Sequence, residues 1–128
     1  MRDYQPKSNK YILPRNLYRQ TLYQIRDYPR LKDECDAIAE SITVQMDGMP
    51  RGSDVGNPTE QKALKRQKYM DIIDCIDRAK KEIPQEYMQG VWLNILYEKP
   101  YPIDAGRATY ARYKSKFVYC VAKNLFLI

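Results

Sequence analysis

Apolar side chains recur at steps of three and four residues along most of the chain, and prolines or glycines interrupt the pattern in a few places. This period is typical of α-helices with one buried face, whereas no segment has the alternating period and hairpin turns of strands. The sequence therefore predicts an all-α fold with a long central helix and a C-terminal helix-turn-helix.

The interruptions also predict how the chain is organised. We expect four segments, namely a flexible basic arm (1–12), an N-terminal helical hairpin (13–46), a loop (47–57), and a long helix followed by the helix-turn-helix (58–128). Within the hairpin, Tyr28-Pro29 should mark a break, because a proline disfavours helix at the residue before it. The long helix should begin with Asn57 as its cap and Pro58 in its first position, and should reach about Glu82.

The C-terminal part is predicted to form a helix, a turn that contains prolines, and a last helix. Apolar residues at helical spacing fill Gln85 to Tyr97, and the link EKPYPI that follows contains two prolines in six residues. Continuous helix through that link is implausible, since proline breaks a helix interior. Asp104 is then an N-cap candidate for a last helix that ends near Asn124.

The charge distribution favours a polyanionic partner. The net charge is +6, and residues 1–32 carry eight Lys or Arg against two Asp or Glu. No acidic residue follows Asp104, whereas five basic residues do. Two basic ends therefore flank a more acidic middle, a pattern that favours nucleic acid without separating DNA from RNA or anionic lipid.

Composition argues against several other classes of protein. The chain has no histidine and only three widely spaced cysteines, Cys35, Cys75 and Cys120, so neither a metal cluster nor Ser-His or Cys-His catalysis is expected. We interpret the cysteines as small core residues in a reducing compartment. No apolar stretch approaches the length of a membrane span. The sequence thus predicts a cytoplasmic protein that is no enzyme and needs no cofactor or metal.

The last helix has two distinct faces at helical spacing. The expected inward face, with Trp92 as the anchor of the helix-turn-helix core, holds Tyr110, Tyr113, Phe117, Val121 and Asn124. The expected outward face holds Thr109, Arg112, Lys116 and Lys123, with Arg107 and Ala108 in the first turn. Arg pairs with guanine and Thr or Ala contacts the thymine methyl, whereas Lys114, Lys116 and Lys123 would neutralise phosphates.

Plainer interpretations of these patterns stay open. A basic face on a terminal helix is often only solvated or in contact with another protein. Arg15, Arg19, Arg26 and Arg30 could form a second phosphate-facing stripe, but a solvated helix face is the commoner explanation. Asp71, Asp74 and Asp77 could bind magnesium, but a mixed-charge helix surface is the commoner explanation.

Three stretches resemble phage-encoded transcriptional regulators of the RinA/ArpU type. They are LPRNLYRQTLYQIRDYPRLKDECDAI, the segment MPRGSDVGNPTEQKAL, and IPQEYMQGVWLNILYEKPYPIDAGRATYARYKSKFVYCVAKNLFLI. The resemblance covers nearly all of the chain from Leu13 onward. It implies a helical protein whose C-terminal helix-turn-helix is similar to region 4 of sigma factors. It also implies a recognition helix that bears Arg107, Thr109, Tyr110, Arg112 and Lys116.

The resulting hypothesis is a sequence-specific DNA-binding regulator of phage late or packaging genes. It would act as a dimer or higher homo-oligomer at the nucleoid of a bacterial host. One alternative is a DNA-packaging component similar to a small terminase subunit. Another is a helical module that binds host RNA polymerase without touching DNA.

Overall fold

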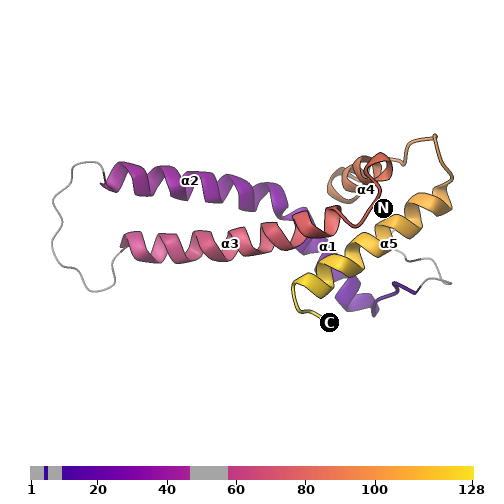
Figure 1. Ribbon diagram of the computed structural model, residues 1–128, viewed down its shortest axis with the longest axis horizontal. Coiled ribbons are helices and arrows are strands. Elements are labelled where there is room, and N and C mark those ends of the chain that lie inside the picture. Colours follow the sequence, from indigo (N-terminus) through magenta and orange to yellow (C-terminus); the bar gives the residue numbers. More distant parts are fainter. Residues whose placement is uncertain (1–4, 6–9, 47–57) are drawn as a thin grey trace. The chain divides into compact units, whose positions relative to one another are not determined.

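The protein is described by a computed structural model that covers residue 5, residues 10–46 and residues 58–128. Within these residues it is all-α, with no strand, which confirms the predicted class. Its five helices are α1 (Arg15–Arg26), α2 (Tyr28–Met46), α3 (Pro58–Lys80), α4 (Gln85–Tyr97) and α5 (Arg107–Asn124), as Figure 1 shows. The predicted arm and loop fall largely outside the described residues.

The helix boundaries follow the prolines with small offsets. The expected break at Tyr28-Pro29 lies one residue earlier, at Asp27, and Pro29 occupies the first turn of α2, where its missing N–H is harmless. Pro84 precedes α4, and its carbonyl accepts bonds from the N–H groups of Tyr87 and Met88. The long helix α3 begins at Pro58, as predicted, and ends at Lys80, two residues before the expected end. Its predicted cap, Asn57, lies outside the described residues.

The chain divides into two compact units that do not coincide with the predicted segments. One unit contains residues 28–74, and the other contains residues 1–27 together with 75–128. The expected hairpin over residues 13–46 is therefore split, because α1 packs with α4 and α5 while α2 belongs to the other unit. The helix α3 passes from one unit into the other between Asp74 and Cys75.

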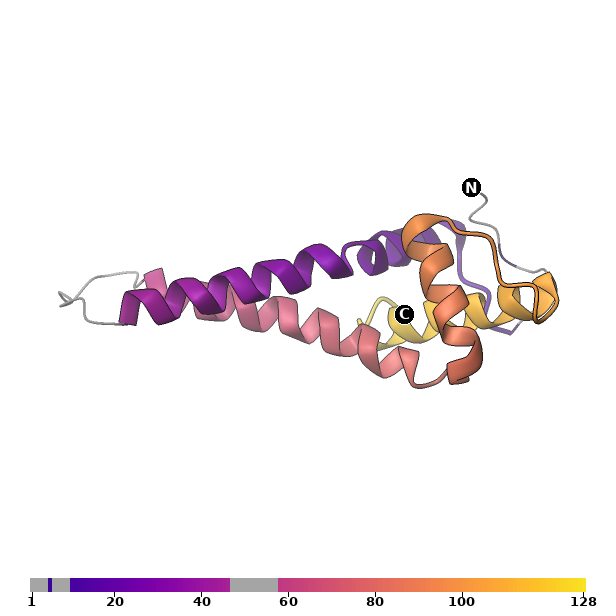
Figure 2. The same cartoon turned by 90° about the horizontal axis from the view of Figure 1, so that it is seen from above.

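The unit of residues 28–74 is a pair of helices. Its two helices, α2 and the first part of α3, lie side by side in both views (Figures 1 and 2). Leu31, Cys35 and Ile73 form a small core between them, against which pack Tyr28, Tyr69, Met70 and Ile72. Towards the other end of the pair the contacts become polar, since Lys62 Nζ donates to Ser41 Oγ at 2.6 Å.

The unit that contains α1, α4 and α5 has the larger core. Its most deeply buried side chains include Tyr18, Leu22, Ile25, Val91, Ile95, Tyr110, Phe117, Val118 and Val121. The predicted inward face of the last helix is therefore right for Tyr110, Phe117 and Val121. Tyr113 and Asn124 are only partly buried.

The predictions for Trp92 and for one cysteine need correction. Trp92 is part-exposed and meets Phe117 edge-on at 6.2 Å between ring centroids, so it flanks the core and does not anchor it. The ammonium of Lys80 lies 3.7 Å from the centre of the Trp92 ring and covers one side of it. Cys35 and Cys75 are buried as expected, whereas Cys120 is partly exposed.

Candidate nucleic-acid interface

The backbone of α4 at Gly90 lies very close to the rings of Pro102 and Tyr110, and this contact determines how α4 packs against the link before α5. A Cβ atom at Gly90 would lie 2.7 Å from Cδ of Pro102 and 2.8 Å from Cε1 of Tyr110. Only a residue without a side chain fits there. The link reverses direction at Glu98, which closes α4 in the left-handed conformation with φ at 55°.

A buried polar contact joins the same link to α5. The Asn94 side chain donates to the Lys99 carbonyl at 2.9 Å and accepts a bond from Lys114 Nζ at 2.9 Å. Lys114 is only 3% exposed. Its prediction as a phosphate contact is therefore wrong, because its ammonium group points into the protein and binds Asn94. Lys114 follows Tyr110 by four residues and precedes Phe117 by three, so helical spacing puts it on the buried side.

Tyrosine rings pack around the start of α5. Tyr110 stacks on Tyr101 at 5.2 Å between centroids and meets the edge of Tyr87 at 5.4 Å, and Tyr87 stacks on Tyr113 at 4.8 Å. The Tyr110 hydroxyl donates to Asp104 Oδ1 at 2.7 Å. This bond, with burial and the nearby carboxylate charge, raises the pKa of Tyr110 to about 12.

Asp104 consequently does not cap the last helix. The N-cap residue is Gly106, which has no side chain to bond the free N–H groups of the first turn, and the helix begins at Arg107. The first turn contains no acidic residue. Because unbonded N–H groups and the helix dipole attract anions, this helix end favours a phosphate group.

The N-terminal half of α5 displays most of its predicted base-reading side chains. Arg107, Ala108 and Arg112 are exposed, and Thr109 is partly exposed. Thr109 and Arg112 share the outward side of the helix, whereas Arg107 is exposed because it lies at the helix end. The structure thus brings the four predicted residues into the first two turns of one helix.

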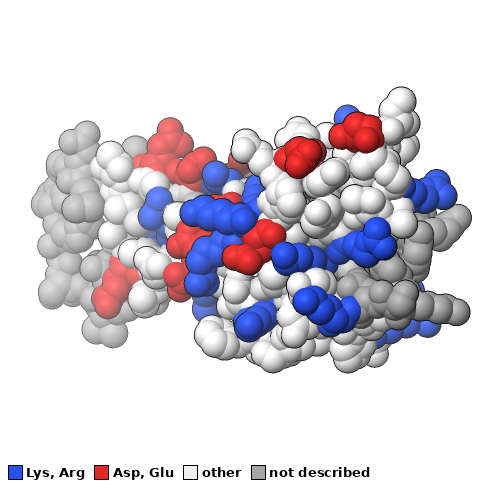
Figure 3. All heavy atoms as spheres, turned by 45° about the vertical axis from the view of Figure 1, so that its right-hand side comes forward, with Lys and Arg blue, Asp and Glu red and all other residues white. Residues whose placement is uncertain are grey.

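The C-terminal half of α5 has a more mixed electrostatic environment. Lys123 is exposed and Lys116 partly so. Burial, and then the carboxylate of Glu82, raises the pKa of the Cys120 thiol, whereas Lys116 and Lys123 lower it. Glu82 therefore shares this part of the surface with both lysines. Figure 3 shows basic and acidic side chains interspersed on the face in view.

A contact between Tyr11 and α5 was not expected from the sequence. The Tyr11 ring meets the Tyr119 ring edge-on at 5.4 Å, and Ser115 Oγ donates to the Tyr11 carbonyl at 3.4 Å. Lys116 Nζ lies 5.9 Å from the centre of the Tyr11 ring. Some 104 residues separate Tyr11 from Ser115 in sequence, so no local pattern signals this contact.

The expected second arginine stripe is not continuous. Arg15 and Arg19 are exposed on α1, but Arg26 Nε donates to the Ile95 carbonyl of α4 at 2.9 Å. Arg30 belongs to the other unit, where its guanidinium lies 5.8 Å from the centre of the Tyr69 ring. Arg30 is also exposed, but it lies outside the unit that contains Arg15, Arg19 and Arg26, so the four arginines do not form one stripe within either unit.

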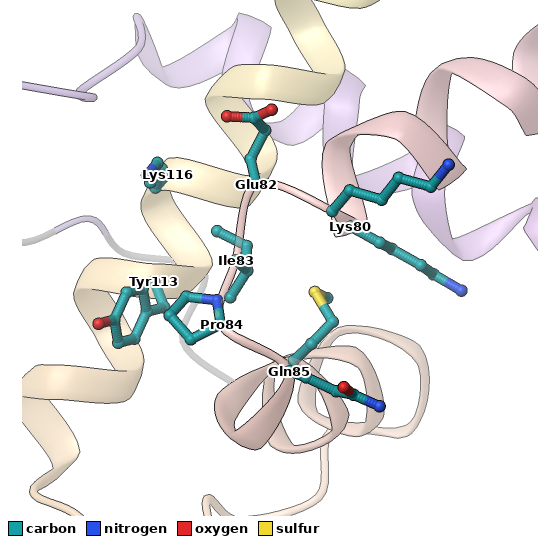
Figure 4. Close-up of a pocket in the computed structure, with 9 residues that line it drawn as sticks. Lys80, Glu82, Ile83, Pro84, Gln85, Tyr113 and Lys116 are labelled. Carbon is teal, nitrogen blue, oxygen red and sulfur yellow. The ribbon is translucent and has the colours of Figure 1, made fainter.

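An open pocket of about 680 Å³ lies at the corner between α3 and α4. Its lining includes Lys80, Glu82, Tyr113 and Lys116. Figure 4 shows Lys80 directed away from Lys116, with Ile83 and Pro84 between them. The cationic groups do not converge, and Lys80 is already placed over Trp92. The pocket is thus a poor anion site.

Metal binding and membrane insertion find no support in the described part of the chain. No three His, Cys, Asp or Glu side chains there are grouped to hold a metal ion, and Asp77 pairs with Lys80 at 4.0 Å. No described helix has the length and apolar character that crossing a membrane requires. Comparisons with protein-family models, curated proteins and solved structures give no match for this chain.

Proposed function

We propose that the protein is a sequence-specific DNA-binding regulator in which α4, the link and α5 form a helix-turn-helix. The observation that carries the proposal is the start of α5. There an uncapped helix end, a first turn without acidic residues, and the exposed Arg107, Ala108 and Arg112 occur together. In a helix-turn-helix, residues near the start of the second helix contact base edges in the major groove.

The roles within α5 follow from side-chain chemistry. Arg107 and Arg112 have the planar donor fork that pairs with guanine, while Ala108 and Thr109 suit the thymine methyl. Lys116 and Lys123 would bind phosphates, which adds affinity without sequence preference. Since Glu82 lies near these two lysines, we expect them to contribute less than the two arginines.

The rigid mounting of α5 supports the same function. Base readout requires side chains held on a well-positioned element. The contacts at Gly90, Asn94 and Tyr110 tie α5 to α4 and to the link on its inner side, and leave the outer side of its first turns open. The molecule thus combines a fixed scaffold with an exposed cationic helix start.

The biological setting of the proposal rests on the sequence resemblance to phage regulators. It favours control of phage late or packaging genes at the nucleoid of a bacterial host. The protein would then act by binding and not by catalysis, with host RNA polymerase as a further partner. Because paired half-sites are read by symmetric oligomers, we also expect a dimer or higher homo-oligomer.

The test compares binding to selected and random duplexes. Sequences enriched from a random DNA library by the wild-type protein should bind more tightly than the unselected pool, and binding should weaken steeply as salt rises. Arg107→Ala and Arg112→Ala should each reduce the preference for the selected sequence by about 1–3 kcal/mol. Lys68→Ala is the control, since it removes an exposed charge from α3 in the other unit.

The possible results separate the roles of these residues. Equal weakening on selected and random DNA would make Arg107 and Arg112 phosphate contacts. Unchanged binding by both variants would remove the start of α5 from the interface. A wild-type protein that enriches no sequence and binds no duplex would refute the DNA-binding proposal.

A further inference from the structure

We infer that Lys10, placed by Tyr11 beside α5, binds a backbone phosphate of the same DNA that α5 contacts. The inference rests on the proposed function and adds a second element to the binding surface. The partner is the phosphodiester backbone of duplex DNA. The observation behind it is the contact of Tyr11 with Ser115 and Tyr119 of α5, beside the outward row of that helix.

Described residues before and after Lys10 in the sequence form contacts that hold them in place. Gln5 forms two hydrogen bonds with Leu13, donating to its carbonyl at 2.9 Å and accepting from its N–H at 2.8 Å. Leu13 itself is 4% exposed. On α5, Ser115 and Tyr119 hold Tyr11 by the hydrogen bond and the ring contact already described. Lys10 is therefore attached to residues whose positions are fixed by these contacts.

Two ammonium groups approach the one Tyr11 ring. Lys10 Nζ lies 5.2 Å from the ring centre and Lys116 Nζ lies 5.9 Å from it. A cation–π contact attracts an ammonium group to a ring face but leaves its N–H donors free. Among the described residues, neither lysine forms an ion pair with a carboxylate within 4.0 Å. The ring thus gathers positive charge that an anion can bind.

The position of Lys10 favours a contact with a backbone phosphate over a contact with a base edge. Helical spacing puts Arg112, Lys116 and Lys123 in one row along the outward side of α5, whereas Ser115 and Tyr119, which hold Tyr11, lie to one side of that row. A helix in the major groove has a phosphate strand on each side of it. A cation beside the row therefore meets the backbone, and its contact carries no sequence preference.

The experiment measures duplex binding as a function of salt concentration, with full-length protein and fluorescently labelled random and selected duplexes. Lys10→Gln should weaken binding to both duplexes by the same factor, about 3–10-fold at moderate salt. It should also reduce the slope of log K against log salt by about one. Lys68→Gln, which removes the same charge from an exposed site in the other unit, should change the slope far less.

Variants at Tyr11 test whether the ring places the lysine. Tyr11→Phe keeps the ring face and should bind like the wild type, whereas Tyr11→Leu removes the ring and should reproduce the loss seen with Lys10→Gln. Thermal unfolding of each variant checks that the fold persists. Lys10 is exposed, so its substitution tests the inference even if Tyr11→Leu fails to fold.

Failure of the inference is distinct from failure of the proposed function. If Lys10→Gln and Lys68→Gln give equal slopes while Arg107→Ala still lowers sequence preference, the inference is wrong and the proposed function stands. If Lys10→Gln weakens only the selected duplex, the contact is to a base and the phosphate assignment is wrong. If the wild-type protein binds no duplex, both proposals are wrong.

Discussion

The pairing of α4 with α5 and the pairing of α2 with α3 use different kinds of contact. Between α4 and α5, Gly90 allows a ring and a proline to approach the backbone closely, and a buried Asn94–Lys114 bond crosses the interface. Between α2 and α3, a core of three buried residues gives way to contacts made by long, partly exposed side chains. Arg66 Nε, for example, donates to the Cys35 carbonyl at 3.2 Å.

This difference predicts unequal stability within one molecule. Regions with few buried apolar contacts open at lower free energy than a packed core does. We therefore expect the α2–α3 pair to exchange its amide hydrogens faster than α5. The start of α5, which is proposed to contact DNA bases, belongs to the more tightly packed unit. Its side chains are therefore held on a helix that seldom opens.

The largest effect should follow from Asn94→Leu. The substitution removes the acceptor of the Lys114 ammonium and the donor to the Lys99 carbonyl, both at low exposure. Losing bonds to buried polar and charged groups should lower the free energy of unfolding by about 3 kcal/mol. Chemical denaturation measures the change.

A double variant sharpens this result. Adding Lys114→Met should recover part of the lost stability, because the buried ammonium group is removed together with its acceptor. If the two single substitutions are simply additive, Asn94 and Lys114 are not coupled. The buried polar bond would then no longer distinguish the α4–α5 pair from the α2–α3 pair.

Leu31→Ala tests the other side of the comparison. Leu31 is 2% exposed in the small core of the α2–α3 pair. Truncating a buried leucine lowers the free energy of unfolding by about 2 kcal/mol or more. The α2–α3 pair has one small core, so few other apolar contacts can compensate for the loss. Hydrogen exchange should accelerate over 28–46 and 58–74 and remain slow over 107–124. Equal acceleration in all three ranges would mean that the two units unfold together.

Gly90→Ala should destabilise the α4–α5 pairing specifically. The new Cβ would meet Pro102 and Tyr110 at distances too short for ordinary contact, and such overpacking costs about 1–3 kcal/mol. Gly106→Ala is the matched control, since a Cβ there has its nearest neighbour, Thr109 Oγ1, at 4.0 Å. Thermal unfolding compares the two variants. Equal shifts in Tm would contradict a special role for Gly90.

The helical architecture could be predicted from the sequence, because each helix depends on residues that are close together in the chain. Stripes of apolar residues and proline breaks located the five helices of the described residues to within a few residues. Helical spacing placed Tyr110, Phe117 and Val121 in the core. The base-reading candidates at the start of α5 are exposed or partly exposed as expected. Their contact with DNA stays a prediction.

The errors arose where a tertiary partner overrode a residue's usual role. Lys114 was predicted to neutralise a phosphate, but Asn94 supplies an acceptor for its ammonium group inside the protein. Asp104 was assigned as a cap, but the Tyr110 hydroxyl binds it. Trp92 was assigned to the core, but Lys80 covers its open side. Each partner comes from another turn or another helix, which a single periodic pattern cannot reveal.

The smallest predicted effect is a pH dependence specific to the α4–α5 side. The pKa of Tyr110 is raised to about 12, first by its hydrogen bond to Asp104, while an unfolded tyrosine titrates near 10. The folded state therefore holds the phenol proton more tightly, and its contribution is complete below pH 10 and lost as pH rises towards 12. Glu86, followed by burial, also raises the pKa of Tyr87, so two phenols act in the same direction.

Tyr110→Phe isolates one of these two phenols. The variant should be slightly less stable than the wild type at neutral pH, because the Asp104 bond is absent, and the difference should shrink between pH 10 and 12. Denaturation followed on α5, with 28–74 as an internal reference, measures the difference, since neither phenol belongs to the α2–α3 pair. A difference that stays constant through this range would mean that the bond to Asp104 does not control the titration of Tyr110. The tighter packing of α5 would then depend on shape and apolar contact alone.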